Sequence, residues 1–304
     1  MPDTHGYLRR FDDMSVNATN KVITSYSTSF TLATRLLAPR VRADIRNLYA
    51  MVRIADEIVD GTAAAAGLST AECGELLDAY EHAVLAAPDT RFHVDPVLHA
   101  YAGSARRCGF DPEHVRAFFT SMRRDLQQST YDPSSFDTYV YGSAEVIGLM
   151  CLSAFLVDHP VTEAERARLD HGARSLGAAF QKINFLRDLA EDSDVLGRSY
   201  FPGVEPTAFS EEEKAGLIAD IRVDLADAEA VMGALPLTAR AGVLAATYLF
   251  AELTDRLEAT PAAELTTRRV SVPRRTKAAI LARAVTTAPR MTSHTTSPKK
   301  AGSA

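Results

Sequence analysis

The chain is poor in the residues that build cross-linked or turn-rich proteins. Its 304 residues include three cysteines, 14 prolines, 16 glycines and no tryptophan. Cys73, Cys108 and Cys151 lie far apart with no Cys-x-x-Cys spacing, a pattern that suggests neither a zinc site nor a disulfide framework. Scattered glycine and proline in a chain that is 46% hydrophobic favour long helices over a β architecture.

Long apolar runs are also missing. The N-terminal residues MPDTHGYLRRFDD lack the apolar core of a signal peptide, and the longest apolar run, residues 146–157, is too short to span a bilayer. We therefore expect a cytoplasmic protein and leave peripheral contact with a membrane open. The sequence does not determine the oligomeric state.

Charge is distributed unevenly along the chain. Residues 265–304 carry nine Lys or Arg and no Asp or Glu, so the net charge of −6 becomes −15 for the first 264 residues. A cationic segment is one sign of nucleic-acid binding. No helix-turn-helix, zinc or aromatic stacking pattern accompanies it, so we expect no nucleic-acid partner.

Apolar residues recur at helical spacing through most of the chain, and polar/apolar alternation is absent, which predicts an all-α protein. We expect one domain over residues 15–287, a loose N-terminal arm at 1–14 and a disordered tail at 288–304. The predicted helices lie at about 44–60, 71–87, 95–109, 112–129, 136–157, 162–193, 210–233, 237–259 and 273–286.

The first candidate site is a polar helix face. Tyr49, Arg53, Asp56 and Asp60 fall within about a 60° arc of one predicted helix, opposite its apolar stripe. Two aspartates four residues apart repel one another and weaken a helix by a few tenths of a kcal/mol. A face that collects them therefore favours a bound cation.

A second face repeats this pattern with amides. Gln181, Asn184, Asp188 and Asp192 fall within about an 80° arc of another predicted helix. Mg²⁺ takes hard oxygen ligands and typically shares one or two carboxylates with substrate phosphates. Two such faces opposite each other would hold a metal-bound diphosphate between them.

A third carboxylate pair serves as an internal comparison. Asp220 and Asp224 are also four residues apart, but their helix face offers no amide or aromatic neighbour. Most such pairs are solvated helix surface, and we interpret this one in that way.

Beyond these spacings, the chain resembles the squalene and phytoene synthase family. The two aspartate motifs of the family are similar to DEIVD at 56–60 and DLAED at 188–192. Further blocks that resemble the family, in the same order, are SYSTSF (25–30), LYAMVRIADEIVDG (48–61), YVYGSAEVIGLM (139–150), FQKINFLRDLAED (180–192), RSYFPG (198–203) and RRVSVPRRTKAAI (268–280).

The resemblance implies a single-domain helical bundle of the isoprenoid synthase type around a central apolar cavity. It implies that Asp56, Asp60, Asp188 and Asp192 hold Mg²⁺, or alternatively Mn²⁺, and that Asn184 assists them.

The resemblance also implies a set of substrate contacts. It assigns contacts with the diphosphate to Arg53, Tyr248, Arg269 and Lys277. Of these, Arg53 and Tyr248 are also assigned a catalytic role. The remaining positions that it assigns to substrate binding are Ser27, Ser29, Phe30, Tyr49, Tyr139, Ser143, Ile147, Gly148, Gln181 and Phe185. One departure is that Tyr26 and Thr28 flank Ser27 where family members often carry a histidine or lysine.

The activity implied by the resemblance is head-to-head condensation of two allylic prenyl diphosphates. The sequence VRIADEIVDG resembles phytoene synthase more than squalene synthase. Phytoene synthase joins two geranylgeranyl diphosphates through a cyclopropylcarbinyl diphosphate without NADPH. Two alternatives remain open. One is a squalene or dehydrosqualene synthase that uses farnesyl diphosphate, and the other is a non-catalytic family member that acts in binding or assembly.

Overall fold

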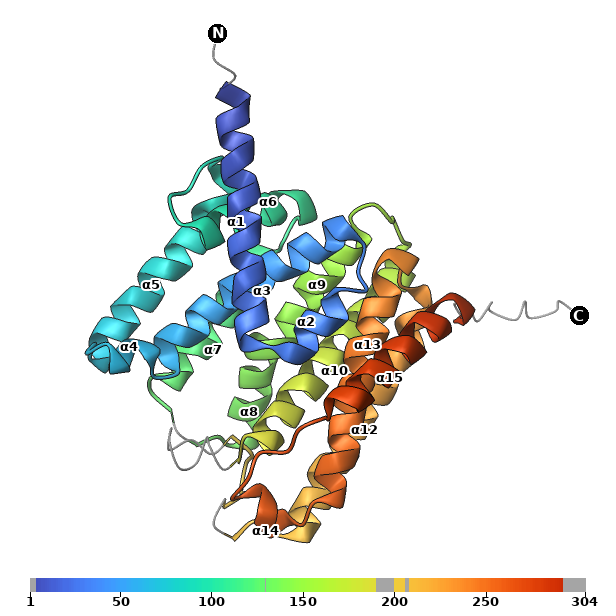
Figure 1. Ribbon diagram of the computed structural model, residues 1–304. Helices are drawn as coiled ribbons and strands as arrows, with labels where there is room; N and C mark the ends of the chain where they lie inside the picture. Colours follow the sequence, from blue (N-terminus) through green and yellow to red (C-terminus); the bar gives the residue numbers. More distant parts are fainter. Residues whose placement is uncertain (1–3, 129, 190–199, 206–207, 292–304) are drawn as a thin grey trace, which may run out of the picture.

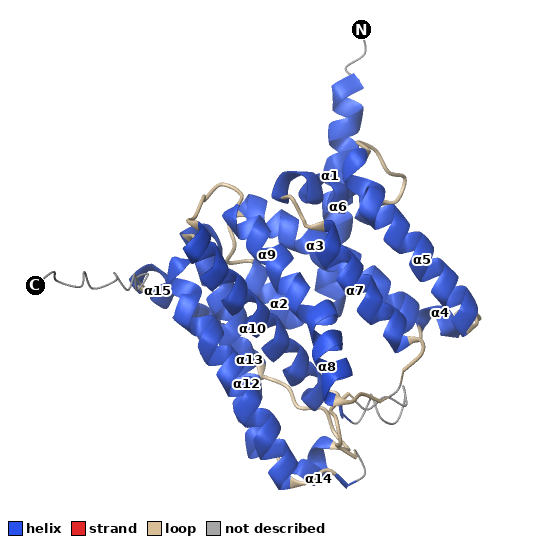
Figure 2. Ribbon diagram, turned by 180° about the vertical axis from the view of Figure 1, so that it is seen from behind, coloured by secondary structure: helices blue, strands red, loops and turns tan. Residues whose placement is uncertain are grey.

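The computed structural model describes residues 4–128, 130–189, 200–205 and 208–291, and within these ranges its regular elements are all helical (Figures 1 and 2). The all-α prediction is confirmed. The α-helices are α1 (Thr4–Tyr26), α2 (Thr28–Thr34), α3 (Pro39–Val59), α4 (Thr62–Ala65), α5 (Thr70–Ala86), α6 (Pro96–Cys108), α7 (Pro112–Asp125), α8 (Pro133–Val140), α9 (Val146–Leu156), α10 (Glu163–Arg187), α12 (Glu211–Val231), α13 (Leu237–Ala259), α14 (Ala262–Leu265) and α15 (Arg274–Thr287).

Helix boundaries follow local chemistry that the sequence already carries. Ser69 and Ser210 begin α5 and α12 with capping boxes, in which the serine side chain and a glutamate three residues later satisfy each other's backbone N–H groups. Gly61 directly follows the α3 C-cap with a φ of 98°, a left-handed conformation that glycine adopts without steric cost.

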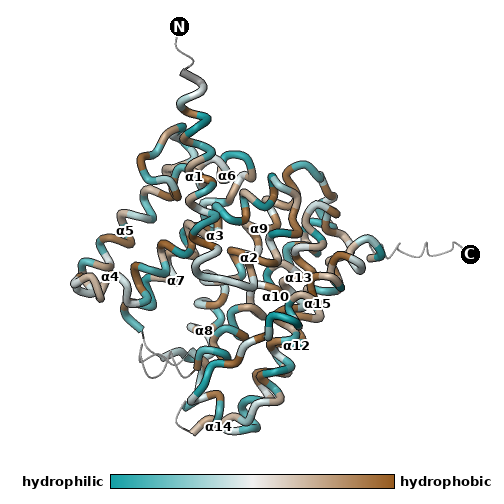
Figure 3. The backbone as a smooth tube through the Cα atoms, in the orientation of Figure 1, coloured by the Kyte–Doolittle hydropathy of each residue, from teal (hydrophilic) through white to brown (hydrophobic). Residues whose placement is uncertain are grey.

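The helices form a bundle around a central space. Helices α3, α9, α10 and α13 surround it, the short helix α2 covers one side, and α12 packs along α10 (Figure 1). Helices α1, α5 and α6 lie on the outer side of α3. Coloured by hydropathy, hydrophilic and hydrophobic residues alternate along most of the helices (Figure 3).

The N-terminal arm that the sequence predicted as loose is helical from Thr4 onward, which corrects that expectation. The ring of Phe11 packs 5.1 Å from the ring of Phe92, and Asp12 forms an ion pair with Arg91 and a 2.7 Å hydrogen bond with His99 Nε2. These partners come from the loop before α6 and from α6 itself, about 80 residues or more away in sequence. Local composition therefore gave no sign that the arm has a surface to pack against.

The predicted disordered tail, residues 288–304, is packed at its beginning, which corrects that boundary. Ala288 is 3% exposed, and the backbone oxygens of Ala288 and Met291 accept hydrogen bonds from Arg240 of α13. Packing therefore continues through Met291, and the remainder of the predicted tail, residues 292–304, lies outside the described residues.

One stretch of the described chain, Pro133–Leu156, is long and apolar enough to cross a membrane. Of its most apolar window, 56% is buried inside the protein. Because this stretch lies between α7 and α10 at the centre of the bundle, its hydrophobicity is accounted for by core packing.

Two glycines allow α10 to approach α9 and the turn before it closely at the cavity wall. A Cβ on Gly148 would lie 2.2 Å from the backbone oxygen of Ala173, and one on Gly177 would lie 2.5 Å from that of Ala144. Backbone atoms cannot move aside as the end of a side chain can. The sequence predicted Gly148 as a substrate contact, whereas the structure also gives it this packing role.

We expect Gly148→Ala to lower the free energy of unfolding by about 1–3 kcal/mol, because the added methyl group must push two helices apart. Gly103→Ala is the matched control, since that glycine is also helical and has open space around it. It should raise stability by about 0.5–1 kcal/mol. Urea unfolding of both variants measures the difference, and equal effects would contradict the close helix contact.

Candidate functional site

The bundle encloses a cavity of about 1050 Å³ that is polar at one end and apolar at the other. Its polar end is lined where α3 and α10 finish, by Asp56, Asp60 and Asp188 among others. Its apolar end is lined where α10 begins and α9 finishes, by residues such as Leu169 and Phe155. The cavity therefore runs along the bundle with its charged groups at one end.

The first predicted face reaches this cavity intact. Tyr49, Arg53, Asp56 and Asp60 all line it from the last three turns of α3. Asp60 is the C-cap residue of that helix, and its N–H donates to the Asp56 backbone oxygen at 2.8 Å. Carboxylates at a helix C-terminus are unfavourable because the helix dipole is negative there.

The electrostatics of this face leave Asp56 short of positive charge. Burial, followed by the negative charge of Asp60, raises the pKa of Asp56 to about 8, although 26% of its side chain still reaches solvent. Arg53 lies 3.8 Å from Asp56 but donates its closer hydrogen bond, at 2.7 Å, to Glu57. A cation beside Asp56 would remove this imbalance.

The second predicted face also lines the cavity, at the end of α10. Gln181, Asn184 and Asp188 contribute to the wall, and Asp188 is the C-cap residue of that helix. Asp188 pairs with Arg187 and, at 2.7 Å, with Arg269. The remaining member of the face, Asp192, lies outside the described residues.

The cationic C-terminal segment contributes to this polar end. Lys277 of α15 lines the cavity and donates a 2.9 Å hydrogen bond from Nζ to the Thr28 hydroxyl. Burial, followed by the charge of Arg187, lowers the pKa of Lys277. Lys277 of α15 therefore places a positive charge beside Ser27, where the flanking residues of this sequence carry none.

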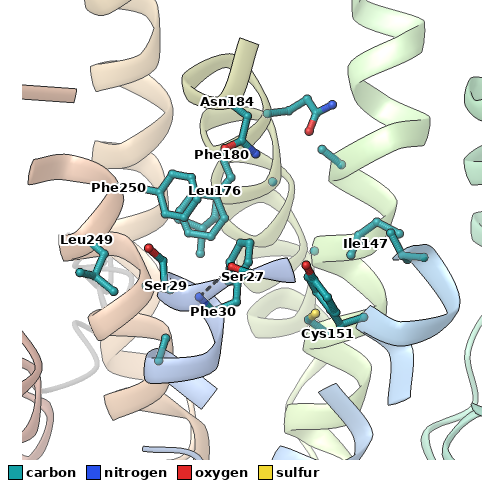
Figure 4. A pocket seen from close by; sticks show the side chains of 18 of the residues that line it. Ser27, Ser29, Phe30, Ile147, Cys151, Leu176, Phe180, Asn184, Leu249 and Phe250 are labelled. Atoms are coloured by element: carbon teal, nitrogen blue, oxygen red, sulfur yellow. Dashed lines mark hydrogen bonds between the residues drawn. The ribbon is translucent and has the colours of Figure 1, made fainter. Parts of the chain in front are cut away.

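The predicted SxSF segment forms α2 and its N-cap. The Ser27 side chain caps the helix by accepting from the Phe30 backbone N–H at 3.2 Å, and Ser29 lies beside it on the cavity wall (Figure 4). The Phe30 ring lies 5.8 Å from Phe180 and 5.5 Å from Phe250, whose own rings stack at 4.0 Å. These three rings join α2, α10 and α13 below the polar end.

The predicted wall residues Tyr139, Ser143, Ile147 and Gly148 all line the cavity. Between α8 and α9 the chain makes a π-helical turn, Tyr141–Glu145, in which the Val146 N–H donates to the Tyr141 oxygen. Such insertions are frequent at functional sites because they redirect side chains. Among the residues that the structure describes, the Ser143 hydroxyl has no hydrogen-bond partner.

Phe185 lines the cavity as predicted, within an aromatic wall. Its ring stacks on Tyr200 at 3.9 Å with an interplanar angle of 10°. Tyr139 lies 6.0 Å from Phe185, and its hydroxyl donates to Asp125 at 2.8 Å.

Polar cavity residues that the sequence analysis did not name include Asp125, Arg187 and Tyr200. Arg187 and Tyr200 lie inside the blocks FQKINFLRDLAED and RSYFPG, so their place in these family-like blocks was the sequence signal that could have identified them. Asp125 has no second carboxylate three or four residues away, and its contacts with Tyr139 and Tyr200 come from other parts of the fold.

Tyr248 is not among the residues that line the cavity, and its catalytic role stays a prediction. It is 9% exposed, and the guanidinium of Arg283 lies 4.3 Å from its ring centroid. Its ring therefore packs toward α15. The neighbouring Leu249 and Phe250 line the cavity instead.

The comparison pair Asp220 and Asp224 lies outside the cavity wall, on α12. Both carboxylates bond to Lys182 of α10, with Asp224 at 2.8 Å, so the pair neutralises a lysine between two packed helices. Of the two side chains, only that of Asp220 is mostly exposed, so Asp224 is not simple helix surface. That the pair has no function stays a prediction.

The donor set at the polar end fits Mg²⁺. Hard carboxylate and amide oxygens lie at two helix C-termini, and the raised pKa of Asp56 reflects negative charge without enough compensation. Within the part of the chain that the structure describes, no three His, Cys, Asp or Glu side chains are close enough to hold a metal by themselves. This arrangement suits ions that share phosphate ligands with a substrate.

Comparison with known proteins gives a consistent result. The family pattern "Squalene/phytoene synthase" matches residues 23–276. The chain is 30% identical over 282 residues to phytoene synthase 3 of Zea mays, covering 87% of this chain and 64% of that protein. It is 30% identical over 191 residues to 15-cis-phytoene synthase of a Paracoccus strain, covering 62% of this chain and 60% of that protein. The chain thus spans less than two thirds of these relatives.

Solved structures share the fold. A dehydrosqualene synthase crystal structure superposes with a TM-score of 0.75 at 19% identity, covering 93% of this chain and 99% of that one. A squalene synthase of Alicyclobacillus acidocaldarius superposes with a TM-score of 0.66 at 18% identity, covering 81% and 95%. At these identities the likeness establishes the fold alone.

We expect inorganic diphosphate with Mg²⁺ to raise the melting temperature of the protein, because a ligand that binds only the folded state stabilises it by mass action. An Arg269→Ala, Lys277→Ala double variant should lose most of this increase. Arg116→Ala, which removes an exposed arginine outside the cavity wall, should keep it. A double variant that responds like the wild-type protein would place the anion elsewhere.

Proposed function

Because the chain belongs to the squalene/phytoene synthase family, we propose that it condenses two geranylgeranyl diphosphates head to head and releases phytoene and two diphosphates. The observation that carries this proposal is one cavity whose carboxylate and cationic groups adjoin a long apolar interior. Leu169 and Asp188 both line it, and they stand about 28 Å apart along α10 at 1.5 Å per residue. A long prenyl chain fits such a space.

Departure of diphosphate requires neutralisation of the charge that develops on its oxygens. Mg²⁺, or alternatively Mn²⁺, would be held by Asp56, Asp60, Asp188 and Asp192 with help from Asn184, and would supply electrostatic stabilisation of the leaving group. The four aspartates that the family pattern requires are all present in the sequence. Their presence favours catalysis over the non-catalytic alternative.

Protein cations complete the diphosphate site in this proposal. Arg187, Arg269 and Lys277 converge on the end of α10 and on α2. Without substrate, the two arginines pair with Asp188. When a diphosphate and its metal occupy the site, these side chains are in reach to bind phosphate oxygens in place of the carboxylate.

The apolar interior protects the carbocation that remains after diphosphate leaves. Phe30, Phe180 and Phe250 form one aromatic wall, and Phe185 with Tyr139 lies in another. Ring faces attract positive charge, and an apolar enclosure excludes the water that would quench it. The second substrate can then capture the cation through its double bond, and a second ionisation at the same cavity leads to the hydrocarbon.

The metal and carboxylate roles can be tested by substitution. Asp56→Asn and Asp188→Asn should each lower turnover by about 10³-fold or more, equivalent to about 4 kcal/mol, because each removes a charged ligand. Asp220→Asn should retain near-normal turnover, since Asp220 lies outside the cavity wall and bonds Lys182. Equal losses in all three variants would show that the cavity carboxylates have no special role.

The final prediction concerns the product. Supplied with geranylgeranyl diphosphate and Mg²⁺ but no NADPH, the protein should release phytoene, because loss of a proton ends the reaction without a reductant. Adding NADPH should change neither rate nor product, as measured by chromatography of the hydrocarbon extract. Farnesyl diphosphate is the competing substrate, since each methylene in an apolar pocket contributes only about 1 kcal/mol. Squalene formed only with NADPH would assign the protein to the squalene branch.

A further inference from the structure

Asp125 is a half-buried carboxylate on the cavity wall that belongs to neither aspartate motif. It is the last residue of α7. Its Oδ2 accepts a hydrogen bond from the Tyr139 hydroxyl at 2.8 Å, and its Oδ1 accepts one from the Tyr200 hydroxyl at 3.3 Å. One carboxylate therefore joins two tyrosines of the cavity wall, one from α8 and one from the segment after α10.

Both tyrosine rings are held by packing. Tyr139 is 2% exposed and Tyr200 is 6% exposed. Tyr200 stacks on Phe185, and the Tyr139 backbone oxygen accepts a hydrogen bond from the Ser121 hydroxyl at 3.1 Å, beside the π-helical turn. With the rings fixed, the torsion of each O–H bond remains to be set, and Asp125 sets it.

The direction of these hydrogens matters to a cation. A phenol has one hydrogen to donate and two lone pairs. With both hydrogens directed at Asp125, neither hydroxyl directs its hydrogen at a cation in the cavity, and the ring faces attract positive charge.

We propose that Asp125 is a positioning residue for the cationic part of the proposed reaction. It turns the hydroxyl hydrogens of Tyr139 and Tyr200 away from the cavity, so that this wall stabilises the carbocation. The inference rests on the proposed function for its consequence, but the two hydrogen bonds can be measured without turnover. Asp125 differs from Asp56, Asp60 and Asp188 in its place on α7 and in its two tyrosine donors, and the Mg²⁺ requirement below tests whether it is a metal ligand.

Steady-state kinetics test the consequence. Asp125→Asn keeps the shape but removes the charge, so kcat should fall about 10²-fold while KM and the Mg²⁺ concentration for half-maximal rate stay within about twofold. Asp137→Asn, an exposed carboxylate change on α8, should have no effect. A large shift in the Mg²⁺ requirement of Asp125→Asn would make Asp125 a metal ligand and overturn the proposal.

A double-mutant cycle tests whether Asp125 acts through the tyrosines. In a Tyr139→Phe, Tyr200→Phe background, Asp125→Asn should reduce kcat by less than about threefold, because the hydroxyls that it orients are gone. The full 10²-fold loss in that background would show that the carboxylate acts independently of them.

Carbon-13 NMR of ring-labelled tyrosine tests the geometry apart from activity. The Cζ signals of Tyr139 and Tyr200, assigned from the single Phe variants, should shift in Asp125→Asn and stay unchanged in Asp137→Asn. Should Asp125→Asn not fold, Tyr200→Phe alone should shift the Tyr139 signal, because the two share one acceptor. Unshifted signals would overturn the proposal. If the wild-type protein makes no hydrocarbon from any prenyl diphosphate, the proposed function fails, and these signals alone decide whether Asp125 holds the hydroxyls.

Discussion

The structure depends on the placement of aspartates at the C-terminal ends of two helices. Asp60 ends α3 and Asp188 ends α10, where the helix dipoles are already negative. On a solvated surface such residues would weaken the helices slightly, but here they stand beside an apolar cavity in which burial raises the pKa of Asp56 to about 8. Carboxylates in such an unfavourable place are compatible with folding when arginines or metal ions neutralise their charge. Arg187 and Arg269 do so for Asp188.

The apolar part of the cavity is maintained by helix geometry. Close contact of α9 and α10 at Gly148 and Gly177 fixes one wall, while the rings of Phe30, Phe180 and Phe250 tie α2 to α10 and α13 on another side. The short helix α2 carries both capping chemistry and cavity contacts. The same helices that form the core therefore decide which side chains a substrate meets.

Polar groups at the aromatic wall have a defined geometry. The π-helical turn between α8 and α9 and the hydrogen bond from Ser121 hold Tyr139, while Phe185 holds Tyr200. Asp125 links the two tyrosines. In the reaction that we propose, this wall would face a carbocation with electron-rich rings, and packing sets their orientation as much as residue type does.

The sequence by itself determined what depends on local spacing. Helical periodicity predicted the all-α fold, Ser69 and Gly61 marked helix ends, and the residues at 49–60 and 181–188 fell on one face because helical rise and turn are fixed. What depends on contacts between distant segments came only from the tertiary structure. Phe11 lies in a helix that packs against Phe92, and the Tyr248 ring packs against Arg283. Lys277 bonds to Thr28, which lies almost the whole chain length away in sequence. Asp125 gained its partners in the same way, because no periodicity in α7 reports which tyrosines of α8 and of the segment after α10 will face it.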